Sequence, residues 1–235
     1  MDKIGVVVTA GGIGRRFGGD KPKQFLEIAG IPVLILTLKR ILRQPLIAQV
    51  VLTVPENYLQ VAGELLSRYN LAGVAVTAGG STRRESVSRG LAQLEKKYTI
   101  VAVHDSVRPF FPADIFKDAV KKIKEGYAGV IPALPLRDTV KEVEDGKVVI
   151  TLDRSRLYAV QTPQVFFRDA LLKGHAYGEK EKLDAFDDSF LVEQTNGQVA
   201  VIPGDNKNFK ITWPEDLEFA EYLFKKYFLK ELADV

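Results

Sequence analysis

The chain of 235 residues contains no cysteine. Disulfide scaffolds, thiolate zinc sites, iron–sulfur clusters and cysteine nucleophiles are therefore excluded. Histidine is almost as scarce, because only His104 and His175 are present. A metal site built from several histidines is excluded as well, so any metal would be a hard cation held by carboxylates or by substrate phosphates.

Long apolar runs and an excess of one charge are also missing. No apolar run approaches about 18 residues, so we expect no transmembrane helix. The first residues, Met1-Asp2-Lys3, lead directly into an apolar segment without the pattern of a signal peptide. The 33 Lys and Arg residues nearly balance the 30 Asp and Glu residues, which argues against nucleic-acid and membrane-surface partners. We expect a cytoplasmic protein that folds as a single domain over residues 1–235.

Strand and helix patterns alternate along the first half of the chain. Continuous apolar segments predict strands that are buried on both faces, at residues 4–9, 49–54, 74–77, 99–104 and 128–133. Amphipathic segments between them predict helices, at residues 32–43, 56–69, 83–97 and 113–125. Further helices are expected at residues 168–178 and 187–196 and from Pro214, with a strand at residues 199–202. This order predicts an α/β fold with a single doubly wound, mostly parallel, Rossmann-like sheet.

The pattern changes after Pro135. Polar and apolar residues alternate on both sides of Asp145-Gly146, a dipeptide favoured in tight hairpin turns. Residues 137–157 therefore predict a protruding antiparallel β-hairpin. Because an isolated two-stranded hairpin is marginally stable in water, we expect it to act as an arm that packs on a second copy and forms a homodimer. The alternative is an edge extension of the main sheet.

The loop after the first predicted strand is rich in glycine and in basic residues. Its glycines let the backbone approach a ligand closely with its amides, and ligands of α/β sheets bind at the carboxyl ends of strands. The basic residues that follow are Arg15, Arg16, Lys21 and Lys23. This combination suits a triphosphate, whereas Phe17 stands where a dinucleotide-binding fingerprint needs glycine. The alternative is a solvated basic loop without a ligand.

Later strands are also followed by polar side chains. A carboxylate at Asp105 could hold a metal or orient a substrate hydroxyl, and Arg108 could bind a phosphate or simply pair with Asp105. The segment from Gly80 to Ser86 lies at the start of a predicted helix and could form hydrogen bonds to the edge of a pyrimidine base. The alternative is that Ser81 and Thr82 merely cap that helix. Lys210 lies in an apolar stretch, which is unusual for a lysine unless it meets an anion or extends to solvent. His104 is expected to be structural.

Taken in order, the motifs resemble those of sugar-phosphate nucleotidyltransferases and, more narrowly, of the 2-C-methyl-D-erythritol 4-phosphate cytidylyltransferase family. The resemblance covers nearly the whole chain, and its motifs are Ala10-Gly-Gly-x-Gly-x-Arg16, Pro22-Lys-Gln-Phe25, Val103-His-Asp-Ser-Val-Arg-Pro109, Arg137-Asp-Thr-Val-Lys141, Asp153-Arg154, Gln161-Thr-Pro-Gln164, Asp187-Asp-Ser189 and Asn208-Phe-Lys-Ile-Thr212. The chain departs from the family pattern at Ser81, where an acidic residue is common, and at Phe186, where threonine is usual. We therefore carry no binding role to Phe186, and we expect Asp187 either to cap a helix or to support the site without contacting the substrate.

The resemblance implies a reaction of CTP with 2-C-methyl-D-erythritol 4-phosphate, with Mg²⁺ or another divalent cation. The expected catalytic residues are Arg16, Lys23 and Lys210. The expected CTP-binding residues are Ala10, Gly11, Gly12, Gly14, Gly80, Arg83 and Ser86. The expected acceptor-binding residues are Asp105, Arg108, Thr139, Arg154 and Thr162. Thr139 and Arg154 would reach the neighbouring subunit's site from the arm, and the cation would be held mainly by substrate phosphates, with Asp105 as a candidate ligand.

Three other functions stay open at this point. The acceptor could be another polyol phosphate such as ribitol 5-phosphate, although Arg137-Asp-Thr-Val-Lys141 resembles the methylerythritol enzymes more closely. A dinucleotide-binding oxidoreductase is disfavoured because Thr53-Val54-Pro55 supplies no acidic residue for a ribose. A non-catalytic nucleotide sensor is disfavoured as well. By the resemblance, Lys210 would lie near the α-phosphate of CTP, and a sensor has no need of a lysine there.

Overall fold

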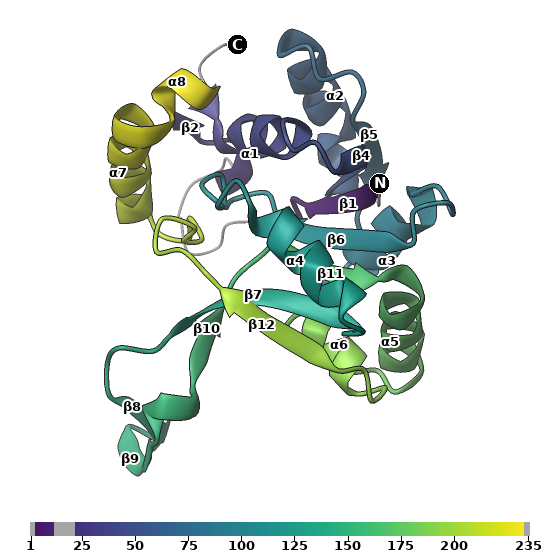
Figure 1. Cartoon of the computed structure of the whole chain (residues 1–235). Helices are drawn as coiled ribbons and strands as arrows, with labels where there is room; N and C mark the ends of the chain where they lie inside the picture. The colour runs from purple at the N-terminus through teal and green to yellow at the C-terminus, as the bar shows by residue number, and fades with distance from the viewer. Residues whose placement is uncertain (1–2, 12–21, 233–235) are drawn as a thin grey trace.

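One mixed sheet forms the centre of the computed structural model, which describes residues 3–11 and 22–232. The strands run in the order β10-β7-β11-β6-β1-β4-β5, and β12 pairs with the other edge of β7 (Figure 1). Their bounds are β1 Ile4–Thr9, β4 Ile47–Val54, β5 Ala75–Ala78, β6 Ile100–Asp105, β7 Gly129–Pro135, β10 Tyr158–Val160, β11 Gln164–Phe167 and β12 Val199–Pro203. Among these described strands, only β10 and β11 run antiparallel to their neighbours. The predicted α/β fold with a mostly parallel sheet is confirmed.

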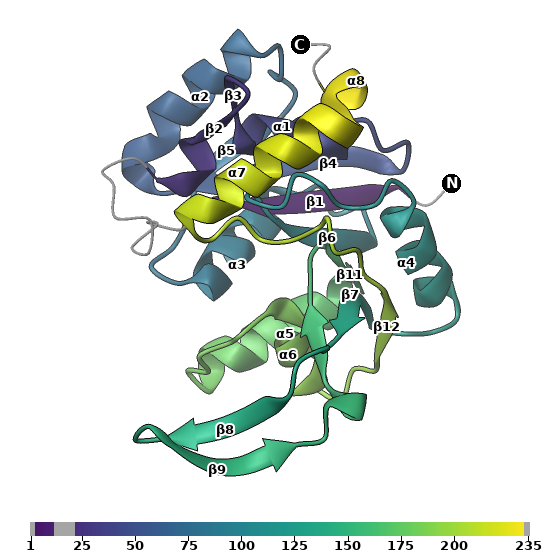
Figure 2. The ribbon, with the colours of Figure 1, turned by 90° about the vertical axis from the view of Figure 1, so that its left-hand side faces the viewer.

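Helices cover both faces of this sheet, because the side chains of β1 are apolar on both faces. Val6 and Val8 point to one face and Val7 to the other, and all three are fully buried. One face is covered by α1 (Val33–Leu42), α2 (Leu59–Arg68) and α4 (Ile115–Lys124). The other is covered by α3 (Arg83–Gln93), α5 (Arg168–Lys180) and α6 (Asp188–Glu193) (Figure 2). No helix among the described residues is long and apolar enough to cross a membrane.

The last described residues lie on the outer side of α1. There α7 (Pro214–Leu223), a π-helical segment (Phe224–Phe228) and α8 (Leu229–Leu232) follow one another, and the first two pack on α1 through a cluster of their own. Small elements complete the fold, namely the 3-10 turns Lys23–Phe25, Glu56–Tyr58 and Arg154–Arg156 and the two-stranded pair β2 (Glu27–Ile28) with β3 (Ile31–Pro32). The helix predicted over residues 83–97 is shorter than expected, since α3 ends at Gln93.

A glycine lets α3 lie close against the sheet. A Cβ atom on Gly90 would come within 2.4 Å of Val7 Cγ1 and 3.0 Å of Thr53 Cγ2. Because real carbon atoms do not approach so closely, only glycine permits this separation between α3 and strands β1 and β4. The N-terminus of α3 is thereby brought to the carboxyl ends of these strands.

The predicted hairpin forms a separate two-stranded sheet of β8 (Val140–Glu144) and β9 (Lys147–Leu152). Asp145 and Gly146 have φ of 48° and 76°, the left-handed pair that a tight two-residue hairpin turn requires. The hairpin points away from the body of the molecule (Figures 1 and 2). The alternative of an edge extension of the main sheet is therefore wrong. The arm leaves Val143, Val148 and Ile150 more than half exposed within one chain.

Candidate active site

The carboxyl ends of β1 and β6 lie side by side and carry the first predicted site residues. Thr9 is paired with Asp105, and the Ser106 N–H donates to the Thr9 carbonyl at 3.1 Å. Ala10 follows directly, and its carbonyl accepts a hydrogen bond of 2.6 Å from the Gln24 side chain. The predicted residues Gly12, Gly14 and Arg16 lie outside the described residues.

Asp105 is the centre of a cluster of positive side chains. Its Oδ2 lies 2.9 Å from Lys210 Nζ and 3.3 Å from Arg108 Nε, and its Oδ1 lies 4.0 Å from Arg83 Nε. Burial by itself would raise the pKa of Asp105, but the charges of Lys210, Arg83 and Arg108 hold this pKa well below its usual range. The structure thus brings four predicted residues together around an ionised carboxylate.

The backbone beside Asp105 is held by Thr162 and His104. Thr162 Oγ1 accepts a hydrogen bond from the Asp105 N–H at 3.0 Å and lies 3.0 Å from His104 Nδ1. His104 Nε2 donates to the Arg108 carbonyl at 3.0 Å, so Nδ1 is left to accept from the Thr162 hydroxyl. Burial lowers the pKa of His104 to about 4. This neutral, enclosed imidazole fits the expected structural role, and the Thr162 hydroxyl is engaged mainly in the same network.

The predicted nucleotide-binding residues meet at the start of α3. The Gly80 N–H donates to Ser86 Oγ at 3.1 Å, and a Cβ atom on Gly80 would lie 2.2 Å from Glu85 Cβ. A Cβ atom on Gly11 would lie 3.7 Å from Ser86 Oγ, so the end of β1 and the first turn of α3 adjoin. Thr82 also caps the helix by accepting from the Glu85 N–H at 3.1 Å. Thr82 therefore caps α3, and this cap fixes the loop that is predicted to bind the nucleotide.

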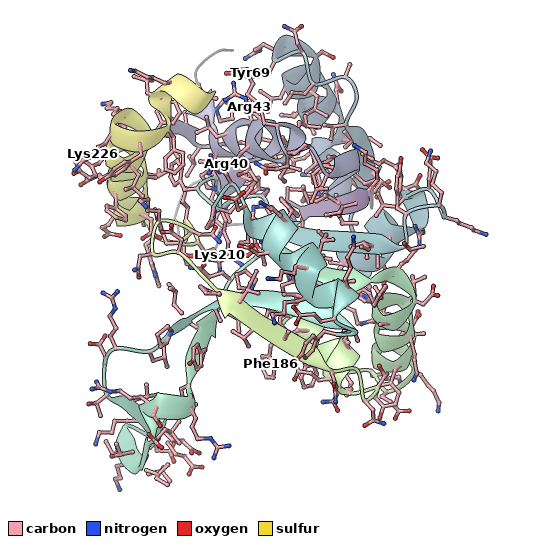
Figure 3. All side chains as sticks on the ribbon, in the orientation of Figure 1. Arg40, Arg43, Tyr69, Phe186, Lys210 and Lys226 are labelled. Carbon is pink, nitrogen blue, oxygen red and sulfur yellow. The ribbon has the colours of Figure 1, made fainter. Side chains whose placement is uncertain are left out.

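Lys23 is tied to the segment that carries Lys210. The Lys23 ammonium donates to the Ile211 carbonyl at 3.0 Å, and only 9% of the residue is exposed. Figure 3 places Lys210 on the stretch that leads from β12 toward α7, above the carboxyl end of the central sheet. The two predicted lysines thus belong to one region, although they are 187 residues apart in the chain.

Thr139 and Arg154 are not brought to this cluster within one chain. Both residues are exposed on the arm, and the Arg154 guanidinium contacts the Arg137 carbonyl instead. Because the arm projects away from the body (Figure 1), these two residues are not part of the Asp105 cluster within one chain.

A polar residue to which the sequence assigned no role, Asn208, supports the cluster. The Asn208 side-chain amide donates to the Thr162 carbonyl at 2.9 Å and to Gln161 Oε1 at 3.2 Å, while the Asn208 backbone carbonyl accepts from Arg108 at 2.8 Å. Asn208 thereby fastens the Lys210 segment to the end of β6. It lies within a motif that carries the family resemblance, but nothing in its spacing indicates these partners.

Arg83 lies between two carboxylates that come from different elements, Asp105 of β6 and Asp188 of α6. Its NH1 atom lies 2.6 Å from Asp188 Oδ2. The neighbouring Asp187 is the N-cap of α6, since it accepts from the Phe190 N–H at 2.8 Å. The expectation that Asp187 caps a helix is confirmed, whereas Asp188 was not foreseen.

The carboxylates of the site fit a cation that is shared with phosphates rather than one enclosed by protein. Within residues 3–11 and 22–232, no group of three or more acidic or histidine side chains could hold a metal ion. Asp105 Oδ2 is engaged by Lys210 and Arg108, whereas Oδ1 has only Arg83, at 4.0 Å, among the described cations. Oδ1 is therefore the oxygen that could face a cation, and the remaining ligands would come from substrate and water.

Comparison with known proteins decides the family. The family model of 2-C-methyl-D-erythritol 4-phosphate cytidylyltransferase matches residues 4–226. The chain belongs to this family. A cytidylyltransferase of this name from Carboxydothermus hydrogenoformans is 70% identical over 232 residues, which is 99% of this chain and 100% of the relative. One from Syntrophus aciditrophicus is 39% identical, with 95% of this chain and 97% of the relative covered.

Solved structures of the cytidylyltransferase family share the fold. The structure of 2-C-methyl-D-erythritol 4-phosphate cytidylyltransferase from Thermus thermophilus superposes with a TM-score of 0.79 at 30% identity, and 95% of this chain and 99% of that chain are covered. The 4-diphosphocytidyl-2C-methyl-D-erythritol synthase from Anaerococcus prevotii gives a TM-score of 0.82 at 28% identity, covering 96% and 99% of the two chains. The resemblance drawn from the motifs is confirmed over nearly the whole length.

Proposed function

We propose that the cluster around Asp105 is where this cytidylyltransferase joins CTP to 2-C-methyl-D-erythritol 4-phosphate, giving 4-diphosphocytidyl-2-C-methyl-D-erythritol and pyrophosphate. The observation that carries the proposal is the position of the ionised Asp105 at the carboxyl end of β6, with Lys210 at 2.9 Å and Arg108 at 3.3 Å. Ligands of open α/β sheets bind at this edge. The positive side chains outnumber the carboxylates there, as two polyanionic substrates require.

The reaction needs positioning and charge neutralisation more than proton transfer. An oxygen of the acceptor's phosphate attacks the α-phosphorus of CTP, the bond from that phosphorus to the bridging oxygen breaks, and pyrophosphate leaves. The acceptor phosphate is largely ionised at pH 7, so no strong general base is required. This agrees with His104, whose two ring nitrogens are engaged within the protein.

We assign the neutralising role to Lys23, Lys210 and Arg16. Fixed cations that face the oxygens of the transferred group stabilise its developing charge without reorganising at the moment of reaction. Asp105 holds Lys210 and Arg108 at 2.9 and 3.3 Å, which restricts both long side chains before substrate arrives. A bound Mg²⁺ ion would supply further neutralisation of the phosphates, with Asp105 Oδ1 as its protein ligand.

The nucleotide base is assigned to the loop that joins β5 to α3. Gly80 and Ser86 are linked by a hydrogen bond of 3.1 Å, and Gly11 adjoins them from β1. Because neither glycine has a side chain, a ligand can approach the backbone closely from both segments. Polar backbone groups there can then form hydrogen bonds to the edge of a pyrimidine base. Arg83, on the same first turn, extends toward Asp105.

We further propose that the arm completes the site of a second copy. Val143, Val148 and Ile150 expose an apolar surface that a partner would cover, and Thr139 and Arg154 are then the arm residues that meet the acceptor. The chain would thus act as a single nucleotidyltransferase domain in a homodimer. A cytoplasmic location, without nucleic-acid or membrane partners, stays a prediction.

The substrates are tested by pyrophosphate release with Mg²⁺ and CTP. 2-C-Methyl-D-erythritol 4-phosphate and ribitol 5-phosphate are offered in parallel, and ATP, GTP and UTP serve as nucleotide controls. We expect turnover only with CTP and the methylerythritol acceptor. Turnover with ribitol 5-phosphate alone would overturn the acceptor assignment, and CTP binding without turnover with either acceptor would favour a nucleotide sensor.

The arm is tested by complementation between two inactive variants. Lys210→Met and Arg154→Ala chains are co-expressed with different affinity tags, and the mixed dimer is purified. One of its two sites has an intact body and an intact arm, so we expect about half of the wild-type activity in a symmetric C₂ dimer. A mixed dimer as inactive as its parents would show that the arm does not serve the partner's site.

A further inference from the structure

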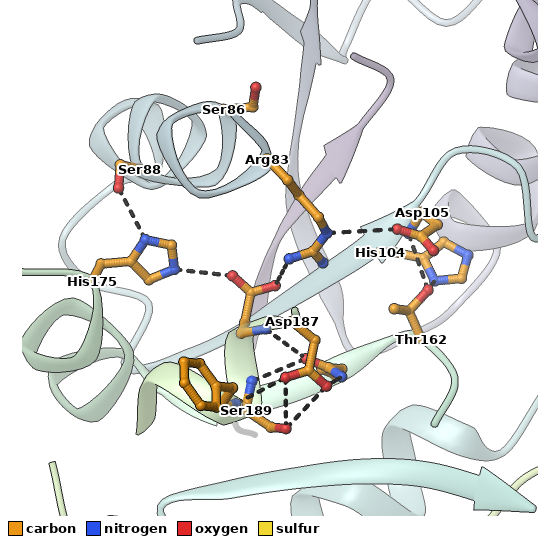
Figure 4. Close-up of polar contacts among 12 residues, drawn as sticks. Arg83, Ser86, Ser88, His104, Asp105, Thr162, His175, Asp187 and Ser189 are labelled. Atoms are coloured by element: carbon orange, nitrogen blue, oxygen red, sulfur yellow. Dashed lines mark hydrogen bonds and ion pairs between the residues drawn. The ribbon is translucent and has the colours of Figure 1, made fainter. Parts of the chain in front are cut away.

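Asp188 is a buried carboxylate that the proposed chemistry does not use. It is the first residue of α6, and none of its side chain is exposed. Its Oδ2 pairs with Arg83 NH1 at 2.6 Å, and its Oδ1 lies 2.9 Å from His175 Nε2 on α5. His175 Nδ1 in turn lies 3.0 Å from Ser88 Oγ on α3 (Figure 4). A continuous polar chain therefore runs from Ser88 through His175 and Asp188 to Arg83.

The position of Asp188 is fixed from its backbone outward. Its N–H donates to Gln164 Oε1 of β11 at 3.2 Å, and the following N–H, of Ser189, donates to the same oxygen at 3.3 Å. Gln164 is itself held by Asp187, to which its amide donates at 2.7 Å. An enclosed carboxylate is tolerated only when it is paired, so α6, β11 and α5 together present one fixed negative charge to Arg83.

This fixed charge matters because Arg83 stands where an arginine is otherwise poorly placed. Arg83 is the first residue of α3, and the N-terminal end of a helix disfavours positive charge. Its other carboxylate, Asp105, is 4.0 Å away and is already engaged by Lys210 and Arg108. Without Asp188, no close pairing among the described residues would hold the guanidinium between the α3 loop and Asp105.

The composition Ser, His and Asp invites comparison with a hydrolytic triad, but the arrangement is reversed. In a triad the serine lies on Nε2 of the histidine and the carboxylate on Nδ1. Here Ser88 lies on Nδ1 and Asp188 on Nε2. Ser88 also lies within α3, remote from any strand-to-helix turn. The group is built to hold Asp188 rather than to supply a nucleophile.

We propose that Asp188, oriented by His175, is a positioning residue for CTP, which acts by fixing the Arg83 guanidinium. The proposal rests on the proposed function, in which Arg83 belongs to the nucleotide site. It assigns no substrate contact to Asp188 itself. It predicts that removing the negative charge weakens CTP binding while leaving the acceptor's site and the fold intact.

The test is Asp188→Asn, with Asp169→Asn, an exposed acidic residue of α5, as the control. The asparagine keeps the shape of Asp188, and its amide can donate to His175 Nε2 if the imidazole takes the other tautomer and donates from Nδ1 to Ser88 Oγ. We expect the Kd for CTP, measured by calorimetry, to rise tenfold or more, with the thermal midpoint within a few degrees of wild type and an unchanged KM for the acceptor. Asp169→Asn removes a carboxylate from the exposed first turn of α5, outside the polar chain from Ser88 to Arg83, and should bind CTP like the wild type.

A double-mutant cycle separates positioning from a general structural effect. If Asp188 acts through Arg83, adding Asp188→Asn to an Arg83→Gln chain should cause no further loss of CTP affinity. Multiplicative losses in the cycle, or wild-type affinity in Asp188→Asn, would overturn the proposal. Because the cycle is read from CTP binding, it gives its answer even if the wild-type chain fails to turn over the expected acceptor.

A second pair of variants tests the part played by His175. The amide nitrogen of glutamine lies near the place of the imidazole Nε2, so His175→Gln can still donate to Asp188 Oδ1. His175→Ala removes the donor and leaves that oxygen buried and unpaired. We expect His175→Gln to retain most of the CTP affinity and His175→Ala to lose it. Equal losses in both variants would show that His175 acts only by packing.

Discussion

Replacement of Lys210 by methionine tests the charge that the site places beside Asp105. Methionine keeps most of the length and apolar surface of the lysine stem but removes the ammonium group. The ammonium lies 2.9 Å from Asp105 Oδ2, and 40% of the lysine side chain is exposed. We assign it to the phosphates of CTP, so its loss should act on turnover more than on folding.

The structure gives separate magnitudes for the loss of stability and for the loss of turnover. Because the Lys210 side chain is partly exposed, its ion pair should contribute about 1 kcal/mol or less to stability. Asp105 would keep Arg108 at 3.3 Å and Arg83 at 4.0 Å, so the carboxylate is not left unpaired. For a chain of this size, such a loss lowers the melting temperature by about 2–4 °C. Removing a fixed donor from the transferred phosphoryl group should lower kcat by about a hundredfold, or about 2.7 kcal/mol of barrier.

Lys207 provides a matched control in the same segment. Its side chain is 42% exposed, as the Lys210 side chain is 40% exposed, and its ammonium lies 3.6 Å from the more exposed carboxylate of Asp205. Pyrophosphate release and thermal unfolding are measured for Lys210→Met and for Lys207→Met. We expect similar melting temperatures in the two variants and a large loss of kcat only in Lys210→Met. Wild-type kinetics in Lys210→Met, or equal losses in both, would refute the assignment of Lys210 to the reacting phosphates.

Two further predictions concern stability. Burial lowers the pKa of His104 to about 4, so the unfolded chain takes up a proton that the folded chain excludes, and stability should fall as the pH drops from about 6.5 toward 4. Between pH 7 and pH 5 the loss should be about 2 kcal/mol by urea denaturation, and a His104→Asn chain that kept the same slope would contradict this origin. Gly90→Ala should lower the free energy of unfolding by about 1–3 kcal/mol, because the new Cβ would meet Val7 Cγ1 at 2.4 Å. Gly63→Ala, in α2 with nothing within 4 Å of its Cβ position, should instead be stabilising by about 0.5–1 kcal/mol, and equal effects would exclude the steric cause.

Local patterns were sufficient for the parallel strands of the sheet and for the arm, but they did not predict the antiparallel strands β10 and β11. A run such as Ile4–Thr9 is apolar on both sides of the strand, and only a strand between two helical layers can bury it. Asp145-Gly146 predicts a hairpin because both residues accept the left-handed backbone that a two-residue turn requires. Both signals act within a few residues, so no tertiary information is needed to interpret them.

The candidate site was predictable only in part. Asp105 and Ala10 could be placed together because both follow parallel strands, and such strands end at one edge of the sheet. The family resemblance gave Lys210 and Arg83 their expected roles. Nothing in the spacing of the residues could assign Asn208 to the Thr162 carbonyl or show that Arg83 has a second carboxylate.

By itself, then, the sequence determined the alternation of parallel strands and helices, the edge of the sheet that carries the candidate site and the family, because these depend on periodicity, turn chemistry and motif order along the chain. Only the tertiary structure decided which charges meet. Asp188 and His175 come from α6 and α5, and α3, which carries Arg83 and Ser88, lies beside them only because Gly90 lets this helix approach β1 closely. Partnerships of this kind are set by the packing of helices across the face of a sheet, which side-chain volumes over the whole core decide.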